Sequence, residues 1–164
     1  MVDVVDEENR VIAKAARQIL LEKGLNFRTA HVLLSNEEGQ FVLQQLSAHH
    51  LRSPNRLGSS VAGYLYSEES YFQAAARKLR EELSVTAQIR NIGEFQMVDE
   101  ASRKFVGVFV GTLQQTPVIA DDQIAELIYL FPTQVDLLLN ADPSRFTPTF
   151  VQVYEHFRRW QRSR

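Results

Sequence analysis

Apolar residues recur at steps of three and four positions along several segments of the chain, and this spacing predicts helices. The strongest pattern covers residues 70–83, where alanines and leucines fall on one face. A second helix is predicted over residues 147–162, because it opens with a threonine followed by a proline, a typical N-cap and first helical position. Weaker patterns predict helices over residues 13–23, closed by Gly24, and over residues 133–139.

Runs of β-branched, aromatic and other apolar residues predict strands over residues 2–5, 29–34, 41–46, 89–98, 105–113 and 124–131. Polar turns at 35–40 and 99–104 join two pairs of these strands into hairpins, and 61–65 is a further short apolar segment. Residues 47–60 contain proline, glycine and several basic residues, which predicts a long surface loop of the kind that often carries function. Because strands alternate with helices and hairpins, we expect an α/β fold in which helices cover a mixed sheet.

The chain of 164 residues contains no internal repeat and no linker rich in proline, glycine or serine, so we predict one domain over residues 1–164. Within it, residues 1–27 form an N-terminal strand–helix extension and residues 147–162 the C-terminal helix. An exposed apolar N-terminal strand is a place where two copies could pair, so a homodimer is a further expectation.

The amino-acid composition is typical of a globular domain and excludes several kinds of functional site. Hydrophobic residues make up 45% and charged residues 23%, as in soluble globular domains, and the net charge of −2 gives no reason to expect nucleic acid or an anionic membrane as a partner. The absence of cysteine excludes disulfides, thiolate catalysis and cysteine-based metal centres. No apolar run is long enough to cross a bilayer, and the acidic first ten residues resemble neither a secretory signal nor a transit peptide, so a cytoplasmic protein is expected.

The helix predicted over residues 70–83 carries the most informative charges. Glu81 and Glu82 lie three and four positions after Lys78, so the three side chains emerge on neighbouring parts of one face, opposite the apolar stripe. Two adjacent carboxylates repel each other unless a cation lies between them, and Mg²⁺ is suited to that place because it prefers oxygen ligands. Two neighbouring glutamates are equally typical of a solvated helix surface.

Residues 63–85, GYLYSEESYFQAAARKLREELSV, resemble the Nudix signature G-x(5)-E-x(7)-R-E-U-x-E-E-x-G-U, in which U is a bulky aliphatic residue. The positions that match are Gly63, Glu69, Arg77, Leu79, Glu81, Glu82 and Val85. Two positions depart from the pattern, because Lys78 replaces a glutamate and Ser84 replaces a glycine.

The resemblance implies an α/β/α sandwich around a mixed sheet and cleavage of a small-molecule diphosphate linked to a second group, often a nucleoside diphosphate derivative. It implies Mg²⁺, with Mn²⁺ as a substitute, coordinated by Glu81 and Glu82. Arg77 would orient a carboxylate through two hydrogen bonds, Glu69 would support the loop before the helix, and Gly63 would permit a tight backbone path. The metal would neutralise the diphosphate and activate water.

The two departures bear on that chemistry. The ammonium of Lys78 can pair with Glu82 or Glu81 and compete with the metal, so weaker Mg²⁺ binding or lost catalysis is expected. A milder alternative is that Lys78 points outward or contacts a substrate phosphate. Ser84 must adopt the backbone conformation that glycine usually supplies there, at modest strain.

Further site residues are less determined by the sequence. The general base is assigned to Glu126, with Asp122 and Glu100 as weaker candidates, although a surface carboxylate explains each of them as well. For phosphate contacts the candidates are Arg28, Arg52 and Arg56. His49 and His50 belong to the same long loop, and solvation alone also explains these basic residues.

Three functions remain for comparison. Residues 2–34 and 55–65 resemble the branch of the family that includes hydrolases related to isopentenyl diphosphate isomerase. The isomerases place a reactive cysteine where this chain has Ala62 and a histidine where it has Tyr64, which argues against isomerisation. The leading hypothesis is therefore a Mg²⁺-dependent pyrophosphohydrolase, and the alternative is a binding module that keeps the fold and has lost catalysis through Lys78.

Overall fold

A seven-stranded mixed sheet forms the centre of the molecule in the computed structural model, which describes residues 1–164. Its strands are β3 (Phe27–Ser35), β4 (Phe41–Leu46), β5 (Leu57–Gly58), β6 (Val61–Tyr64), β7 (Ile89–Asp99), β8 (Ser102–Thr112) and β9 (Ile124–Leu130). The order β5-β4-β3-β8-β7 runs across the sheet, while β6 pairs with β3 and β9 pairs with β4. The β3–β8 pair is parallel and the other pairs are antiparallel, so the expected mixed sheet is confirmed.

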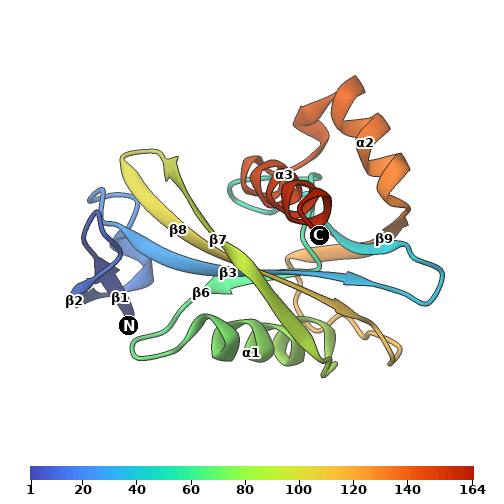
Figure 1. Cartoon of the computed structure of the whole chain (residues 1–164). Helices are drawn as coiled ribbons and strands as arrows, with labels where there is room; N and C mark the ends of the chain where they lie inside the picture. The colour runs from blue at the N-terminus through green and yellow to red at the C-terminus, as the bar shows by residue number, and fades with distance from the viewer.

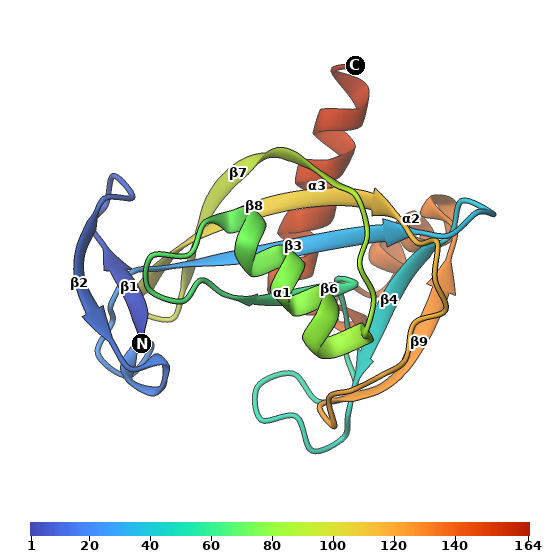
Figure 2. The same cartoon turned by 90° about the horizontal axis from the view of Figure 1, so that it is seen from below.

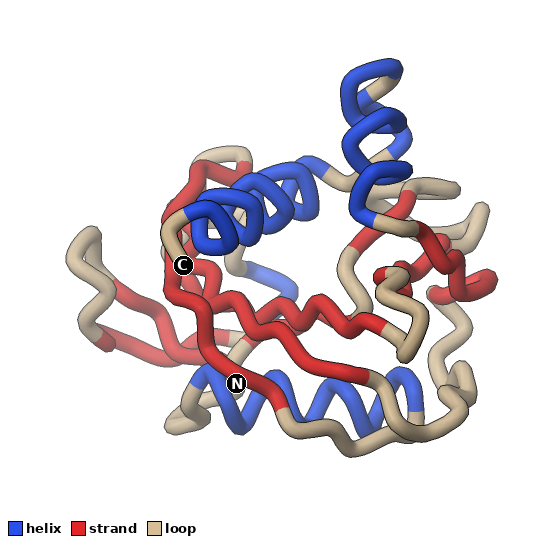
Figure 3. The backbone as a smooth tube through the Cα atoms, turned by 45° about the vertical axis from the view of Figure 1, so that its right-hand side comes forward, coloured by secondary structure: helices blue, strands red, loops and turns tan.

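Helices cover both faces of this sheet. One face is covered by α1 (Tyr71–Leu83), whereas α2 (Pro132–Ala141) and α3 (Pro148–Arg162) lie on the other, as Figures 1 and 3 show. Two apolar clusters of 13 buried residues each fill the layers, one under α1 and one under α3. The α/β sandwich predicted from the sequence is therefore confirmed. None of these helices combines the length and apolar character that a membrane span requires.

The helix α1 begins and ends at positions that the sequence indicates. The Ser70 side chain accepts a hydrogen bond from the Gln73 N–H, and the Gln73 side chain accepts one from the Ser70 N–H, which is a capping box. Ser84 closes the helix in the left-handed conformation with φ of 56°, as expected for a residue in the place of glycine. Gly107 on β8 leaves room for the Tyr71 ring, since a Cβ there would lie 2.5 Å from Tyr71 Cδ1.

The N-terminal extension differs from its prediction. Instead of a helix over residues 13–23, the chain forms a hairpin of β1 (Val2–Val5) and β2 (Val11–Ala15), followed by a single 3₁₀ turn at Arg17–Ile19. Asn9 adopts a left-handed φ of 66° in the turn, and β-branched residues at the start of β2 favour the strand. The hairpin lies beyond one end of the sheet (Figure 2). Contrary to expectation, β1 is buried, and β2 is the exposed strand.

The remaining predicted elements are present with small shifts at their ends. Each predicted strand begins and ends within three residues of the observed one, and α2 extends the predicted helix 133–139 at both ends. The loop 47–60 contains the two-residue strand β5. Thr147 caps α3 by accepting a hydrogen bond from the Phe150 N–H at 3.1 Å, as the threonine–proline pair indicated.

Candidate functional site

A pocket of about 700 Å³ surrounds the short strand β6. The strand pairs with β3, and three of its residues, Ala62, Gly63 and Tyr64, line the pocket. Side chains alternate between the two faces of a strand. Gly63 is directed toward α1, because a Cβ at Gly63 would meet Lys78, and the neighbouring Ala62 and Tyr64 therefore point to the opposite face. The pocket thus has two sides. Residues of α1 and of the sheet face toward α1 line the first, which we call the α1 side, and residues of the opposite sheet face line the second, which we call the sheet side.

Arg77 organises the α1 side. Its guanidinium donates two hydrogen bonds to Glu69, at 2.8 and 3.0 Å, and another at 2.8 Å to Glu81. It also donates to the Tyr64 carbonyl at 2.9 Å and stacks 3.7 Å from the centre of the Tyr66 ring. The hydrogen bonds to Glu69 raise the pKa of Arg77. Burial acts to raise the pKa of Glu69, but the hydrogen bonds from Arg77 outweigh it and the pKa is lowered.

Lys78 and Glu82 form an ion pair inside the pocket. Lys78 Nζ lies 3.3 Å from Glu82 Oε2, and both side chains are largely buried. Gln44 on β4 donates through Nε2 to Glu82 Oε1 at 3.0 Å and to the Ser60 carbonyl at 2.8 Å, which joins the carboxylate to the sheet. Burial raises the pKa of Glu82, although Lys78 and Gln44 act to lower it. Glu82 is thus a buried carboxylate neutralised by an ammonium of the same helix.

Gly63 makes room for this lysine. A Cβ at residue 63 would lie 2.6 to 2.8 Å from the Cγ, Cδ and Cε atoms of Lys78. Gly63 does not have a positive φ, so the tight backbone path expected from the resemblance is not the reason for glycine here. Glycine at residue 63 leaves the space that the Lys78 stem fills beside the strand.

On the sheet side, a second charged cluster lies at the β7–β8 turn. Lys104 Nζ donates to Asp99 Oδ2 at 3.1 Å and to Thr149 Oγ1 at 2.7 Å, and Arg52 donates to Asp99 Oδ1 at 2.6 Å. Burial acts to raise the pKa of Asp99, but the two cations lower it below its ordinary value. The Arg52–Asp99 contact ties the loop 47–60 to the turn between β7 and β8.

Two polar residues of β3 complete the sheet side. His31 Nδ1 lies 2.8 Å from Ser59 Oγ, and burial lowers the pKa of His31 to about 3, so the ring is neutral near pH 7. Thr29, two residues earlier on the same face, has a hydroxyl oxygen with no hydrogen-bond partner. His31 and Thr29 both line the pocket.

Comparison with known proteins agrees with this architecture. The model of the NUDIX domain matches residues 25–150. The chain belongs to the Nudix family. It is 32% identical over 161 residues to the isopentenyl-diphosphate Delta-isomerase of Nocardia farcinica, covering 94% of this chain and 92% of that protein. It is 25% identical over 148 residues to the uncharacterized Nudix hydrolase YfcD of Escherichia coli K12, covering 90% and 80%.

Among solved structures, DR0079 from Deinococcus radiodurans superposes with a TM-score of 0.74 and 26% identity, covering 85% of this chain and 88% of that one. The Nudix domain of Shewanella oneidensis NrtR, solved with ADP ribose, has a TM-score of 0.63 at 16% identity. At this identity the similarity is evidence for a shared fold and not for a shared function.

Nudix proteins typically use a divalent metal, and the donor set of this chain does not fit one held between Glu81 and Glu82. The Glu81 side chain is 43% exposed and is engaged by Arg77, while Glu82 is buried and is engaged by Lys78. Lys78 therefore occupies the side of Glu82 where a cation would bind. No group of three or more histidine, aspartate or glutamate side chains is arranged to hold a metal ion.

The structure brings part of the predicted Nudix site together. Gly63, Arg77, Lys78, Glu82 and Arg52 all line the pocket, as do Glu100 and His50. Glu69 and Glu81 accept hydrogen bonds from Arg77 but do not line this pocket, and Glu69 lines a second pocket together with Arg77. Glu82 is only 9% exposed, so the alternative of a solvated helix surface does not apply to it.

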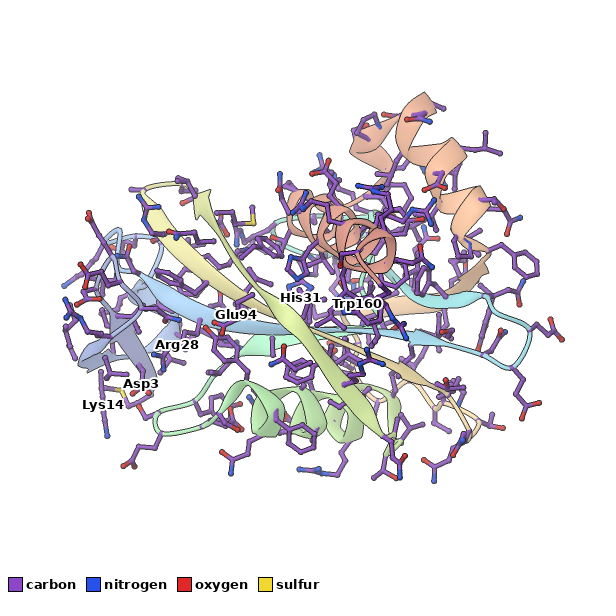
Figure 4. The ribbon with its side chains drawn as sticks, viewed as in Figure 1. Asp3, Lys14, Arg28, His31, Glu94 and Trp160 are labelled. Carbon is purple, nitrogen blue, oxygen red and sulfur yellow. The ribbon has the colours of Figure 1, made fainter.

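Other predicted residues lie elsewhere. Glu126 faces Gln45 across the β4–β9 pair, and because Gln44 points to Glu82, Gln45 and Glu126 lie on the opposite face of the sheet. The guanidinium of Arg28 donates to the side chain and the carbonyl of Asn9 in the hairpin turn, and Arg28 and His31 (Figure 4) lie on opposite faces of β3. The candidates Arg28, Arg56 and Glu126 are thus outside the pocket lining, as are Asp122 and His49.

Sequence reasoning missed the pocket residues Thr29, His31, Gln44, Asp99, Lys104 and Asp121. Four of these are polar residues within otherwise apolar strands, and that contrast is the signal that was available. Asp121 belongs to a loop that reaches the end of α1 through a hydrogen bond from the Ala120 N–H to the Glu82 carbonyl, at 2.9 Å. Nothing in the sequence indicates that contact.

Proposed function

We propose that this Nudix protein binds a small molecule containing a diphosphate, with the Lys78 ammonium in the position where family members hold a metal, and that Mg²⁺-dependent hydrolysis is not its activity. The observation that carries the proposal is the Lys78–Glu82 pair, whose charged atoms lie 3.3 Å apart inside the pocket. The geometry of this one side chain favours a binding module over the hydrolase.

The ammonium is chemically suited to that role. It has three N–H donors, of which Glu82 accepts one, so two remain for phosphate oxygens in the pocket. Five of the residues that line the pocket are arginine or lysine and four are aspartate or glutamate, so an anionic ligand there has cationic groups within reach besides Lys78. Glu82 in turn holds the ammonium in place, as a carboxylate holds a metal ion.

A Mg²⁺-dependent pyrophosphohydrolase acting on a nucleoside diphosphate derivative is the second candidate. The observation that favours it is the network of Glu69, Arg77 and Glu81, which keeps three charged residues of the Nudix signature in mutual contact. The two candidates differ in whether binding requires a divalent ion and whether products form.

Calorimetric titration with inorganic pyrophosphate and with ADP ribose, in EDTA and in excess Mg²⁺, tests the proposal. We expect binding that is no tighter in Mg²⁺ than in EDTA. Lys78→Met keeps the stem and removes the charge, and it should weaken binding about 10- to 100-fold, the range for a hydrogen bond to a charged group. Lys14→Met, at an exposed lysine of β2, is the matched control and should bind normally.

Product analysis on the same samples separates the candidates. Mg²⁺-dependent cleavage of ADP ribose by the wild type, lost in Glu82→Gln, would overturn the proposal in favour of the hydrolase. Binding without cleavage, insensitive to EDTA and sensitive to Lys78→Met, supports it.

A further inference from the structure

We infer that Arg17, a residue of the N-terminal extension, binds a carboxylate at the end of the ligand remote from the diphosphate, together with the hydroxyl of Tyr64. The inference rests on the proposed function, because it places a second anionic group relative to the diphosphate that Lys78 binds. Residue 17 lies outside residues 25–150, which the model of the NUDIX domain matches. This recognition therefore belongs to the extension of this chain rather than to the shared domain.

Arg17 is the one cationic residue of the pocket lining that forms no ion pair. Five arginine and lysine side chains line the pocket. Four of them form ion pairs within the protein: Arg52 and Lys104 with Asp99, Arg77 with Glu69 and Glu81, and Lys78 with Glu82. The guanidinium of Arg17 instead lies over the Tyr64 ring, 5.5 Å from the ring centre. A ligand anion can therefore bind Arg17 without breaking an existing ion pair.

The fold holds residue 17 beside the sheet side of the pocket. Arg17 begins the 3₁₀ turn that follows β2, and the buried residues Ala15 and Leu20 anchor the chain on both sides of it. These two residues share an apolar cluster with Phe27, whose ring centre lies 5.2 Å from that of Tyr64. The backbone of Arg17 is thus fixed relative to β6, while its side chain is exposed and accessible to a ligand.

Tyr64 supplies a second donor next to Arg17. Its side chain lines the pocket, and its hydroxyl forms no hydrogen bond with the protein and is not among the buried unpaired atoms, so it retains accessible surface. Burial raises the pKa of Tyr64, and the nearby charges of Arg52 and Arg17 act to lower it. The phenol is therefore protonated near pH 7 and can donate to a carboxylate oxygen.

The charges of the sheet side favour an anion with a single negative charge. Arg52 and Lys104 are both paired with Asp99. The pKa of Arg52 is raised mainly by its hydrogen bond to Asp99, and the charge of Glu100 acts in the same direction. A carboxylate carries one negative charge, which the guanidinium of Arg17 neutralises. A phosphate monoester carries nearly two near pH 7, and Asp99 and Glu100 would repel it more strongly.

Calorimetry in EDTA with a matched pair of probes tests the inference. UDP-glucose and UDP-glucuronate share the nucleoside, the diphosphate and the sugar ring, and they differ only in a carboxylate at the remote end. We expect the wild type to bind UDP-glucuronate about tenfold more tightly than UDP-glucose, as for a hydrogen bond between charged groups, and Arg17→Met to bring this ratio to about one. Tyr64→Phe should reduce the ratio about threefold, because it removes one neutral donor. Neither substitution should change the Kd of inorganic pyrophosphate.

Lys23→Met is the matched control, because Lys23 is an exposed cation of the same extension outside the pocket lining, and it should keep the wild-type ratio. Thermal melts show whether each variant folds. NAD⁺ and NADP⁺ form a second pair of probes, which differs by a remote phosphate monoester. A preference for NADP⁺ that exceeds the preference for UDP-glucuronate and is lost in Arg17→Met would overturn the assignment of a carboxylate.

The inference is also overturned if UDP-glucuronate binds no more tightly than UDP-glucose, or if Arg17→Met weakens pyrophosphate as much as UDP-glucuronate. The two proposals can fail separately. Pyrophosphate binding that is weakened by Lys78→Met, with equal affinity for the two UDP probes, would support the proposed function and overturn the role of Arg17. A preference for UDP-glucuronate that depends on Arg17 but is insensitive to Lys78→Met would do the reverse, and failure of every probe to bind would overturn both.

Discussion

Lys78 Nζ lies 3.3 Å from Glu82 Oε2, one helical turn along α1, and the stem of the lysine crosses β6 at Gly63. Helical i, i+4 pairs on a protein surface contribute only a few tenths of a kcal/mol. This pair is largely buried, so each charge depends on the other for neutralisation. The same contact that stabilises the helix within the pocket also occupies the carboxylate that a metal would need.

Lys78→Glu should create a divalent-ion site. The substitution places a second carboxylate beside Glu82 and near Asp121, and removes the competing ammonium. We expect Mg²⁺ uptake that is detectable by calorimetry in the variant and stronger than in the wild type, together with Mg²⁺-dependent diphosphate cleavage that the wild type does not show. Because the two carboxylates repel each other without a cation, the variant should melt lower in EDTA and regain stability in Mg²⁺.

Lys78→Gln is the control for that experiment, since it removes the positive charge without adding a carboxylate. It should show no gain in Mg²⁺ affinity comparable to that of Lys78→Glu. Unchanged Mg²⁺ titration and unchanged turnover in Lys78→Glu would show that this face of α1 is wrongly assigned.

Gly63→Ala should destabilise the protein through Lys78. The added methyl carbon would lie 2.6 Å from Lys78 Cδ, and displacing the lysine should lower the free energy of unfolding by about 1–2 kcal/mol. In a Lys78→Ala background the clash is gone, and alanine in a strand should be neutral or stabilising by up to about 1 kcal/mol. Urea unfolding of the four proteins gives the coupling energy, and purely additive effects would contradict the packing described.

The buried His31 should make stability depend on acid pH. Its folded pKa of about 3 lies below the ordinary value of 6.5, so the unfolded chain takes up the proton first. The stabilisation is present above pH 6.5 and is lost as the pH falls from 6.5 toward 3, by up to about 5 kcal/mol. Glu82 acts in the opposite direction, because its raised pKa favours protonation in the folded state.

Subtracting the unfolding curves of His31→Asn from those of the wild type isolates the contribution of His31. The difference should shrink steadily below pH 6.5. NMR titration of the imidazole gives the pKa directly, and a value near 6.5 would contradict the buried, neutral ring.

The α1 side of the site was predictable because it lies within one helix and its flanking loop. Spacing along a helix limits which side chains meet, so the positions indicated that Lys78 pairs with Glu82 or Glu81, and the structure shows Glu82. Which residues lie on the sheet side depends on the register of strand pairing, because a shift of one residue turns every side chain of a strand to the opposite face of the sheet. Glu126 was assigned as general base from its position in the sequence, whereas its pairing with Gln45 directs it to the face of the sheet opposite to Glu82.

The N-terminal error has a different cause. Residues 13–23 are rich in alanine, lysine, arginine and leucine, which favour helices locally. Pairing of β2 with β1 overrides that preference, and burial of Leu20 and Phe27 against β1 holds the hairpin in place. Tertiary contacts of this kind cannot be derived from the local pattern.

Ser84→Gly should stabilise the protein. Ser84 ends α1 with φ of 56° and ψ of 36°, a left-handed conformation that is strained for a residue with a Cβ. Its exposed side chain forms no hydrogen bond that would be lost. We expect a gain of about 1 kcal/mol in the free energy of unfolding by urea titration. Ser84→Ala keeps the strain and should not show this gain; an equal gain in both variants would rule out the backbone explanation.

Arg77→Lys should be strongly destabilising although it preserves the charge. The guanidinium bonds to Glu69 twice, to Glu81 and to the Tyr64 carbonyl, and it stacks on Tyr66, a set of contacts that a single ammonium cannot reproduce. With Glu69 largely buried and poorly paired, we expect the free energy of unfolding to fall by about 2–4 kcal/mol. Arg80→Lys is the matched control, because Arg80 is an exposed arginine of the same helix, and it should change stability by less than about 0.5 kcal/mol. Equal, small effects of the two substitutions in urea unfolding would mean that the Arg77 network does not hold the loop before α1 in place.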